Sequence, residues 1–281
     1  MLRTHEQISS RLAALGIDHR KPGFYDHQEF VAQERVSPEF LEEYAQFVAT
    51  LPTTADYVAR VLRDVPVIAG IVHRELVADG RLGACIDIGM ILSRILEQEE
   101  IWNVQVKGSL TVDFQNVSSL PKQYYWSVDQ TAVPFAAAHS WLVVPPYSVV
   151  DVALKQQPYR RGREYIPTIV LSQSRERAPF QIERIISPEI RSLAARAFGK
   201  ATADGLAEHF APAWLRMRDV LPPVVIDQEG IQLTYDAVAI GAPDAPFEQM
   251  VNWPVNGRLG LQLYRELIAP ALQVARGDST T

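Results

Sequence analysis

The sequence predicts an α+β fold in which a helix packs on an antiparallel sheet and further helices are added at both ends. Helical patterns of apolar residues fill most of the first 100 residues, and amphipathic patterns return after residue 187. Short alternating stretches with turn residues between them lie in residues 104–154. Strands and helices do not alternate one by one, as they would in a parallel α/β sheet.

The composition is that of an ordinary globular protein, with 47% apolar and 21% charged residues among 281. The net charge of 27 − 33 = −6 gives no concentrated basic face, so we expect no nucleic-acid partner. No apolar run reaches the length of about 18 residues that predicts a membrane span. The polar N-terminus carries no signal-peptide pattern, so we expect a cytoplasmic protein; an effector secreted by a non-Sec pathway would look the same.

Metal and disulfide chemistry are not expected. The single cysteine excludes an internal disulfide and a cysteine-based zinc or iron–sulfur site, and the six histidines are scattered. No glycine-rich phosphate loop, dinucleotide fingerprint or paired-histidine motif occurs.

The length allows one large domain or two smaller ones, and the order of the expected elements divides the chain into three regions. They are an N-terminal helical region (1–64), a central catalytic core (65–175) and a C-terminal α/β extension (176–281) that either packs on the core or stands apart.

The N-terminal helices have clear start signals. Ser37-Pro38-Glu39 combines a capping hydroxyl, a proline at the first helical position and an acid in the first turn. Pro52-Thr53-Thr54 starts a second helix, and residues 67–77 form a third that ends at Asp79-Gly80.

The core begins with an apolar helix over residues 86–96. Alternating residues over 104–114, around Gly108, predict a strand or a strand pair. Strands over 140–144 and 148–154 follow, and the prolines between them predict a hairpin connection.

One more strand is expected at the end of the core, over residues 169–171. The C-terminal extension mixes both element types. Its expected strands are residues 224–226 and 231–235, and its expected helices are residues 188–198, 205–218 and 259–274, the last interrupted by Pro270.

Cys85 lies where a glycine-containing loop enters the apolar helix. The unpaired amides and partial positive charge of a helix N-terminus favour a thiolate there. Gly83 leaves room for a substrate carbonyl, and the amide of Cys85 is placed to donate to an oxyanion.

His139 begins one predicted strand and Asp151 lies in the next. Neighbouring antiparallel strands can bring these side chains together, and an aspartate bonded to one imidazole nitrogen leaves the other for the thiol. A carboxylate within an apolar strand is costly to bury without such a partner. Taken singly, Cys85 reads as a buried structural thiol and His139 as a strand-end histidine; their joint pattern favours a nucleophile with its base.

Four segments carry a family resemblance: Gly83-Ala84-Cys85, Val104–Gly108, His139-Ser140-Trp141 and Val149–Ala153. Over about residues 65–155, they resemble the transglutaminase-like cysteine enzymes of the papain-like superfamily. The resemblance implies a papain-like core with Cys85 as nucleophile, His139 as base and Asp151 as orienting acid. It implies hydrolysis or acyl transfer at an amide, of protease, amidase, deamidase or transglutaminase type, through a thioester and without a cofactor. The substrate would be a protein, a peptide or another amide, and the oligomeric state stays open.

The candidate substrate-binding residues are Trp141, Tyr125 and Trp126. The long connection over residues 108–138 departs from a minimal core and predicts a lid or a substrate wall that contains the two aromatic residues. Trp141 is expected either in the core or at the groove. Arg160, Arg161 and Arg163 form a basic cluster, read as a solvated loop or a contact to an acidic partner.

Two alternatives remain. Arg81–Cys85 is similar to the cysteine motif of arylamine N-acetyltransferases, although Leu82 and Asp87 depart from it. The second alternative is a non-catalytic binding protein that keeps the fold. The reactivity of the thiol separates the enzymatic readings from the binding protein.

Overall fold

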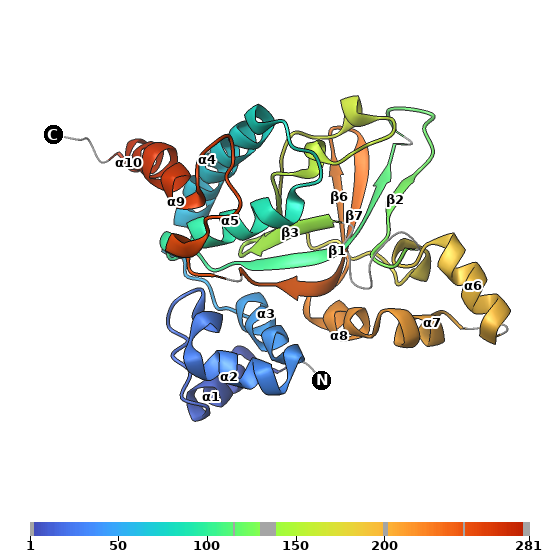
Figure 1. Cartoon of the computed structure of the whole chain (residues 1–281), viewed down its shortest axis with the longest axis horizontal. Coiled ribbons are helices and arrows are strands. Elements are labelled where there is room, and N and C mark those ends of the chain that lie inside the picture. The colour runs from blue at the N-terminus through green and yellow to red at the C-terminus, as the bar shows by residue number, and fades with distance from the viewer. Residues whose placement is uncertain (1–2, 115, 130–138, 199–201, 244, 278–281) are drawn as a thin grey trace.

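The computed structural model describes residues 3–114, 116–129, 139–198, 202–243 and 245–277 (Figure 1). One seven-stranded sheet has the order β5-β4-β3-β1-β7-β6, with β2 also paired to β1, and every pairing is antiparallel. The strands are β1 (Val104–Asp113), β2 (Gln123–Tyr125), β3 (His139–Val144), β4 (Tyr147–Asp151), β5 (Val170–Ser172), β6 (Val224–Gln228) and β7 (Ile231–Gly241). The predicted α+β class with an antiparallel sheet is confirmed.

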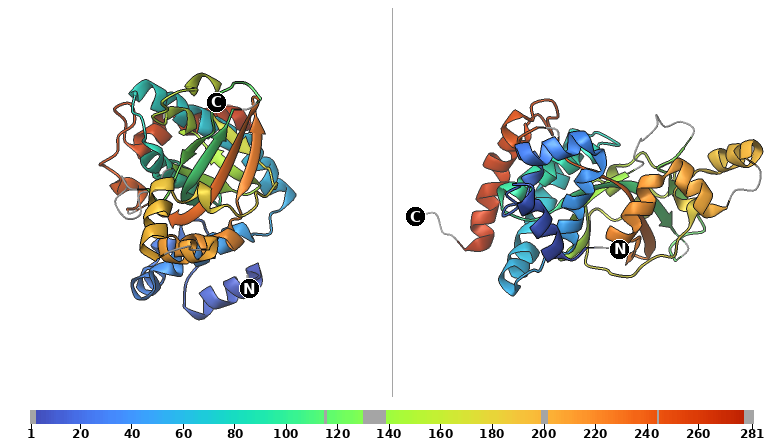
Figure 2. Two further views of the ribbon diagram at one scale, coloured as in Figure 1. Left: turned by 90° about the vertical axis from the view of Figure 1, so that its right-hand side faces the viewer. Right: turned by 90° about the horizontal axis from the view of Figure 1, so that it is seen from below.

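Helices lie on two sides of this sheet. Helices α4, α5 and the C-terminal helices lie on one side, and the N-terminal helices with α8 lie on the other (Figures 1 and 2). The helices are α1 (His5–Ala14), α2 (Gln28–Val36), α3 (Leu41–Ala49), α4 (Ala55–Asp79), α5 (Cys85–Gln98), α6 (Pro188–Phe198), α7 (Ala203–Phe210), α8 (Pro212–Val220), α9 (Gly260–Leu263) and α10 (Ala269–Arg276). None of the described helices combines the length and apolar character that crossing a bilayer requires.

Side chains of β3 alternate between two hydrophobic cores. Trp141 packs in the core that contains the N-terminal helices, whereas Leu142 and Val144 pack in the core that contains α4 and α5. Period-2 alternation sends successive side chains to opposite faces, so a strand covered on both faces is apolar throughout. The almost uninterrupted apolar run of residues 141–144 is therefore explained by burial on both faces.

Helix α4 is a single helix of 25 residues, where the sequence predicted two. Pro66 lies inside it and removes the backbone bond to the carbonyl of Leu62. Leu62 is 38% exposed, so the turn that loses this bond lies at the surface. The helix crosses the boundary expected after residue 64. The Thr54 hydroxyl accepts from the amide of Tyr57 and caps its start.

Two other helix predictions need correction in detail. Residues 205–218 were expected as one helix but belong to α7 and α8, which are separated at Ala211 because Pro212 starts the second. The last helix contains a π-helical turn, Tyr264–Ile268, between α9 and α10.

The C-terminal extension supplies part of the same sheet. Strand β7 pairs with β1 from Gln105 to Asp113, and β6 pairs with β7. The sheet therefore has no boundary at residue 175, and β7 lies between the edge strand β6 and β1, the strand that follows the cysteine helix.

Strand β1 is one strand with an irregular register between Lys107 and Gly108. A Cβ atom at Gly108 would lie 2.1 Å from the carbonyl oxygen of Asp236 and 2.6 Å from a ring carbon of Trp141. Only glycine fits this approach. Gly108 also pairs directly with His139 of β3, so the tight packing lies beside a candidate catalytic residue.

Candidate active site

Cys85 is the first residue of α5. Its N-cap residue is Ala84, whose methyl side chain cannot accept a hydrogen bond from the first-turn amides, so these amides stay available to a ligand. Gly83 has a φ of 72°, a left-handed conformation that favours glycine, and its amide donates to the carbonyl of Gln156 at 2.9 Å. The loop before the cysteine is thereby fixed to the segment that follows β4.

The structure brings His139 and Asp151 together. His139 is the first residue of β3 and Asp151 the last of β4, so both lie at the same end of this hairpin. The Nε2 atom of His139 lies 2.5 Å from Oδ2 of Asp151, and the two residues are 0% and 1% exposed. The predicted contact across neighbouring strands is thus present in a fully buried pair.

Asp151 has two further hydrogen-bond donors. The amide of Ala153 donates to Oδ1 at 3.0 Å, and the hydroxyl of Tyr235 donates to Oδ2 at 2.9 Å. Burial and the nearby Asp151 carboxylate raise the pKa of Tyr235 well above its ordinary value, so Tyr235 stays a donor. Three donors compensate for the buried charge and fix the carboxylate toward the imidazole.

The electrostatics of His139 favour its protonated form. Complete burial lowers the pKa of His139, but the charge and hydrogen bond of Asp151, with a smaller contribution from Cys85, raise it to about 10. Since Nε2 is bonded to Asp151, the Nδ1 atom is the ring nitrogen left for the thiol. Nδ1 is buried and has no hydrogen-bond partner among the described residues. An imidazole held this way can take a proton from sulfur and keep it.

Space beside the thiol is narrow. Cys85 is 5% exposed, and the cavity that it lines together with Gly89, Trp141 and Asp151 has a volume of about 10 Å³. This volume holds no substrate, so a substrate carbonyl reaches the sulfur only when the surrounding side chains move.

Side chains around the cysteine loop are structural. Arg81 pairs with Asp79 and also lies 3.6 Å from Asp87 in the first turn of α5. The Arg81 guanidinium donates to the carbonyl of Pro254 at 2.8 Å. These contacts agree with reading Asp79 and Arg81 as turn residues. His73 is also structural: it is buried, and its Nδ1 lies 2.8 Å from the carbonyl of Val152.

Trp141 lies in the core. It is 3% exposed, and its ring centroid is 5.0 Å from that of Tyr235 and 6.2 Å from that of His139. Of the two places expected for Trp141, packing is the one that the contacts support. The side chain stabilises the strand that carries His139 and does not line the large groove described next.

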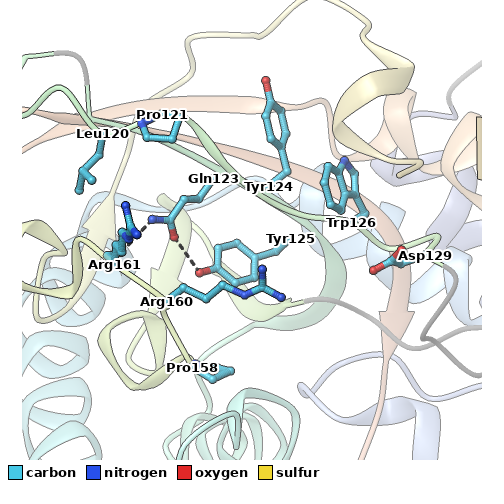
Figure 3. A pocket seen from close by; sticks show the side chains of 10 residues that line it. All are labelled: Leu120, Pro121, Gln123, Tyr124, Tyr125, Trp126, Asp129, Pro158, Arg160 and Arg161. Atoms are coloured by element: carbon cyan, nitrogen blue, oxygen red, sulfur yellow. Dashed lines mark hydrogen bonds between the residues drawn. The ribbon is translucent and has the colours of Figure 1, made fainter. Parts of the chain in front are cut away.

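Tyr125 and Trp126 do line a groove, with a volume of about 700 Å³ (Figure 3). One wall is β2 and the residues beside it, and the other is the segment 158–161. Tyr125 points toward that segment, whereas Tyr124 and Trp126 point away from it and stack with 5.6 Å between their ring centroids. Both residues expected at a substrate wall therefore line a surface groove, and the segment that carries them continues into residues 130–138, which lie outside the described residues.

Sequence reasoning missed two residues. Tyr235 holds the carboxylate of Asp151, and Tyr159 packs against Tyr125 of the groove. The ring of Tyr159 is 5.6 Å from that of Tyr125, and its pKa is raised well above the ordinary value by burial and by charges that include Asp151 and Cys85. The only sequence signal for Tyr235 was its place in a predicted strand, which did not show that the strand lies beside β1.

Comparisons with known proteins add no relative. A scan against protein-family models, a search of curated proteins and a search of solved structures each found no match. Over the described ranges, no three histidine, cysteine, aspartate or glutamate side chains come together as a metal site.

Proposed function

We propose that this chain is a cysteine enzyme of the transglutaminase-like, papain-like type. Its Cys85 attacks an amide, breaks the C–N bond and forms a thioester. Depending on the acceptor, it acts as a hydrolase (protease, amidase or deamidase) or as a transglutaminase. The observation that carries this proposal is the buried His139–Asp151 pair, whose remaining imidazole nitrogen is left for the cysteine at a helix N-terminus.

Each residue has a defined role in the reaction. The Nδ1 atom of His139 takes the thiol proton, and the sulfur attacks the amide carbonyl. The amide of Cys85 donates to the oxyanion that forms. When the tetrahedral intermediate collapses, the imidazolium returns its proton to the leaving amine and the C–N bond breaks. Water or a second amine then attacks the thioester, and His139 accepts its proton as the carbon–sulfur bond breaks.

Asp151 keeps this cycle in one orientation. Its carboxylate fixes the imidazole by Nε2 and stabilises the imidazolium, which explains why the pKa of His139 is raised to about 10 despite burial. Tyr235 and the amide of Ala153 hold the carboxylate in turn. Asp151 therefore acts as an orienting group, and His139 alone moves protons.

Thiol reactivity tests the proposal. Iodoacetamide at neutral pH should alkylate Cys85 about tenfold faster than a free thiol peptide, because Nδ1 of His139 is left to accept the proton of a cysteine at a helix N-terminus. The His139→Ala variant should lose this advantage. Equal rates in the two proteins would contradict the proposal and favour a binding protein that keeps the fold.

The narrow cavity beside Cys85 is the observation that favours the non-catalytic alternative. A protein without turnover needs no space for a substrate at the sulfur. A Cys85 thiol that reacts with iodoacetamide but cleaves no amide substrate would support that alternative. A Cys85-dependent acetylation of an aromatic amine by acetyl-coenzyme A would instead support the arylamine N-acetyltransferase alternative.

A further inference from the structure

We propose that the groove between β2 and residues 158–161 selects substrates with acidic side chains near the reactive amide. This inference rests on the proposed function, because it assigns a substrate class to the same site. The groove's volume of about 700 Å³ provides the room for a peptide segment that the cavity at Cys85 lacks.

Two arginines give the groove its charge. Arg160 and Arg161 both line it and are both exposed. Within the part of the chain that the structure describes, neither guanidinium makes an ion pair or hydrogen bond. Arg163, the third member of the cluster, differs: it donates to the carbonyl of Lys155 and to Oε1 of Gln156. The loop is thus fixed by one arginine and presents two others to a ligand.

The shape of the groove holds these guanidinium groups close to aromatic and amide side chains. Gln123 donates to the carbonyl of Arg161 at 2.8 Å, and the Tyr125 hydroxyl donates to Gln123 at 3.3 Å (Figure 3). The one acidic residue of the lining, Asp129, has an interaction of its own. An excess of positive charge beside a partly apolar wall fits carboxylate side chains of a peptide.

The groove is connected to the proposed catalytic residues. Tyr125 on the groove wall packs against Tyr159, which is within electrostatic reach of Cys85 and Asp151. The chain between Asp151 and the groove is also fixed to the cysteine loop: the carbonyl of Gln156, two residues before Pro158, accepts from the amide of Gly83. A peptide whose acidic residues contact Arg160 and Arg161 is therefore held beside Tyr159, which lies within electrostatic reach of Cys85 and Asp151.

A pair of reactive peptides tests the proposal. The probes are iodoacetyl-Gly-Gly-Glu-Glu amide and iodoacetyl-Gly-Gly-Lys-Lys amide, which alkylate Cys85 through the same group. At low salt the acidic probe should react about tenfold faster than the basic one. The difference should shrink as ionic strength rises, because exposed charges are screened. Arg160→Gln/Arg161→Gln should abolish the preference.

A matched control removes the same charge elsewhere. Arg35 and Arg265 are exposed and do not line the groove, so Arg35→Gln/Arg265→Gln should keep the preference. Iodoacetamide should alkylate all three proteins at one rate, which also shows that the variants are folded. Equal rates for the two peptides in the unmodified protein, or a preference that survives Arg160→Gln/Arg161→Gln, would overturn the inference.

If Cys85 proves not to be a reactive nucleophile, a binding experiment still tests the groove by itself. If Cys85 is no more reactive than a free thiol, calorimetric titration with acetyl-Gly-Gly-Glu-Glu amide and its lysine counterpart still measures the groove. Tighter binding of the acidic peptide, lost in Arg160→Gln/Arg161→Gln, would support the groove alone. Equal binding of the two peptides would refute it.

Discussion

The hydroxyl of Tyr235 on β7 donates a hydrogen bond to Asp151. Removing this hydroxyl tests how much the bond contributes to stability and to the reactivity of Cys85. Tyr235→Phe removes one of three donors from a buried carboxylate. We expect the free energy of unfolding to fall by about 1–2 kcal/mol, measured by urea denaturation, and the alkylation rate of Cys85 to fall severalfold. Tyr165→Phe is the control, since no hydrogen bond holds the Tyr165 hydroxyl among the described contacts. Equal rates and stabilities for both variants would mean that Tyr235 only fills space.

The residues of the candidate triad illustrate what a sequence can and cannot predict. Asp151 was predictable because a carboxylate in an apolar strand needs a partner, and a hairpin places His139 within reach. Tyr235 was not, because its contact depends on β7 lying beside β1, a pairing between strands more than 100 residues apart that no local pattern specifies. The narrow space beside the thiol depends on packing from several elements and was equally out of reach.

At the scale of elements, substituting Gly108 by alanine tests the tight packing around β1. Gly108→Ala would place a methyl group 2.1 Å from the Asp236 carbonyl oxygen, opposite His139. Because that atom belongs to the backbone of β7, the strands must separate, and we expect a loss of about 2–4 kcal/mol in the free energy of unfolding. Urea denaturation measures it, and the alkylation rate of Cys85 should fall with it.

Gly70 is the matched control for Gly108. It lies inside α4 and has open space where a Cβ would be added, so Gly70→Ala should stabilise the protein by about 0.5–1 kcal/mol. Similar losses for both variants would contradict the tight packing inferred at Gly108.

Element boundaries were predictable where local chemistry sets them. Thr54 and Gly80 delimit α4 as a cap and a left-handed end residue, and the prolines between β3 and β4 marked the hairpin. The continuity of α4 through Pro66 was not predictable, because it depends on tertiary packing that outweighs the cost of the proline. The same holds for the C-terminal extension, whose strands were recognisable although their place in the sheet was not.

At the scale of the whole molecule, the raised pKa of His139 links stability to pH. The folded-state pKa of His139 is about 10 and the ordinary value is 6.5, so between these limits the imidazole holds a proton in the folded protein that it lacks in the unfolded chain. The stabilisation from this protonated imidazole is complete below pH 6.5 and is lost as the pH rises through about 10. The free energy of unfolding should therefore decline over this window, with a slope of up to about 1.4 kcal/mol per pH unit.

The comparison that isolates this effect is His139→Gln, measured by urea denaturation at intervals from pH 6 to pH 10.5. Tyrosines and lysines titrate in both proteins, so the difference in unfolding free energy between them reports the imidazole. This difference should shrink as the pH rises, since the unmodified protein loses a charge that the variant never had. Amide turnover should fall over the same alkaline range, because a neutral imidazole cannot protonate the leaving amine, whereas alkylation by iodoacetamide needs only the thiolate and should persist. A stability difference that stays constant with pH would show that the His139–Asp151 pair is not charged in the folded protein, and the imidazolium would then have no place in the reaction.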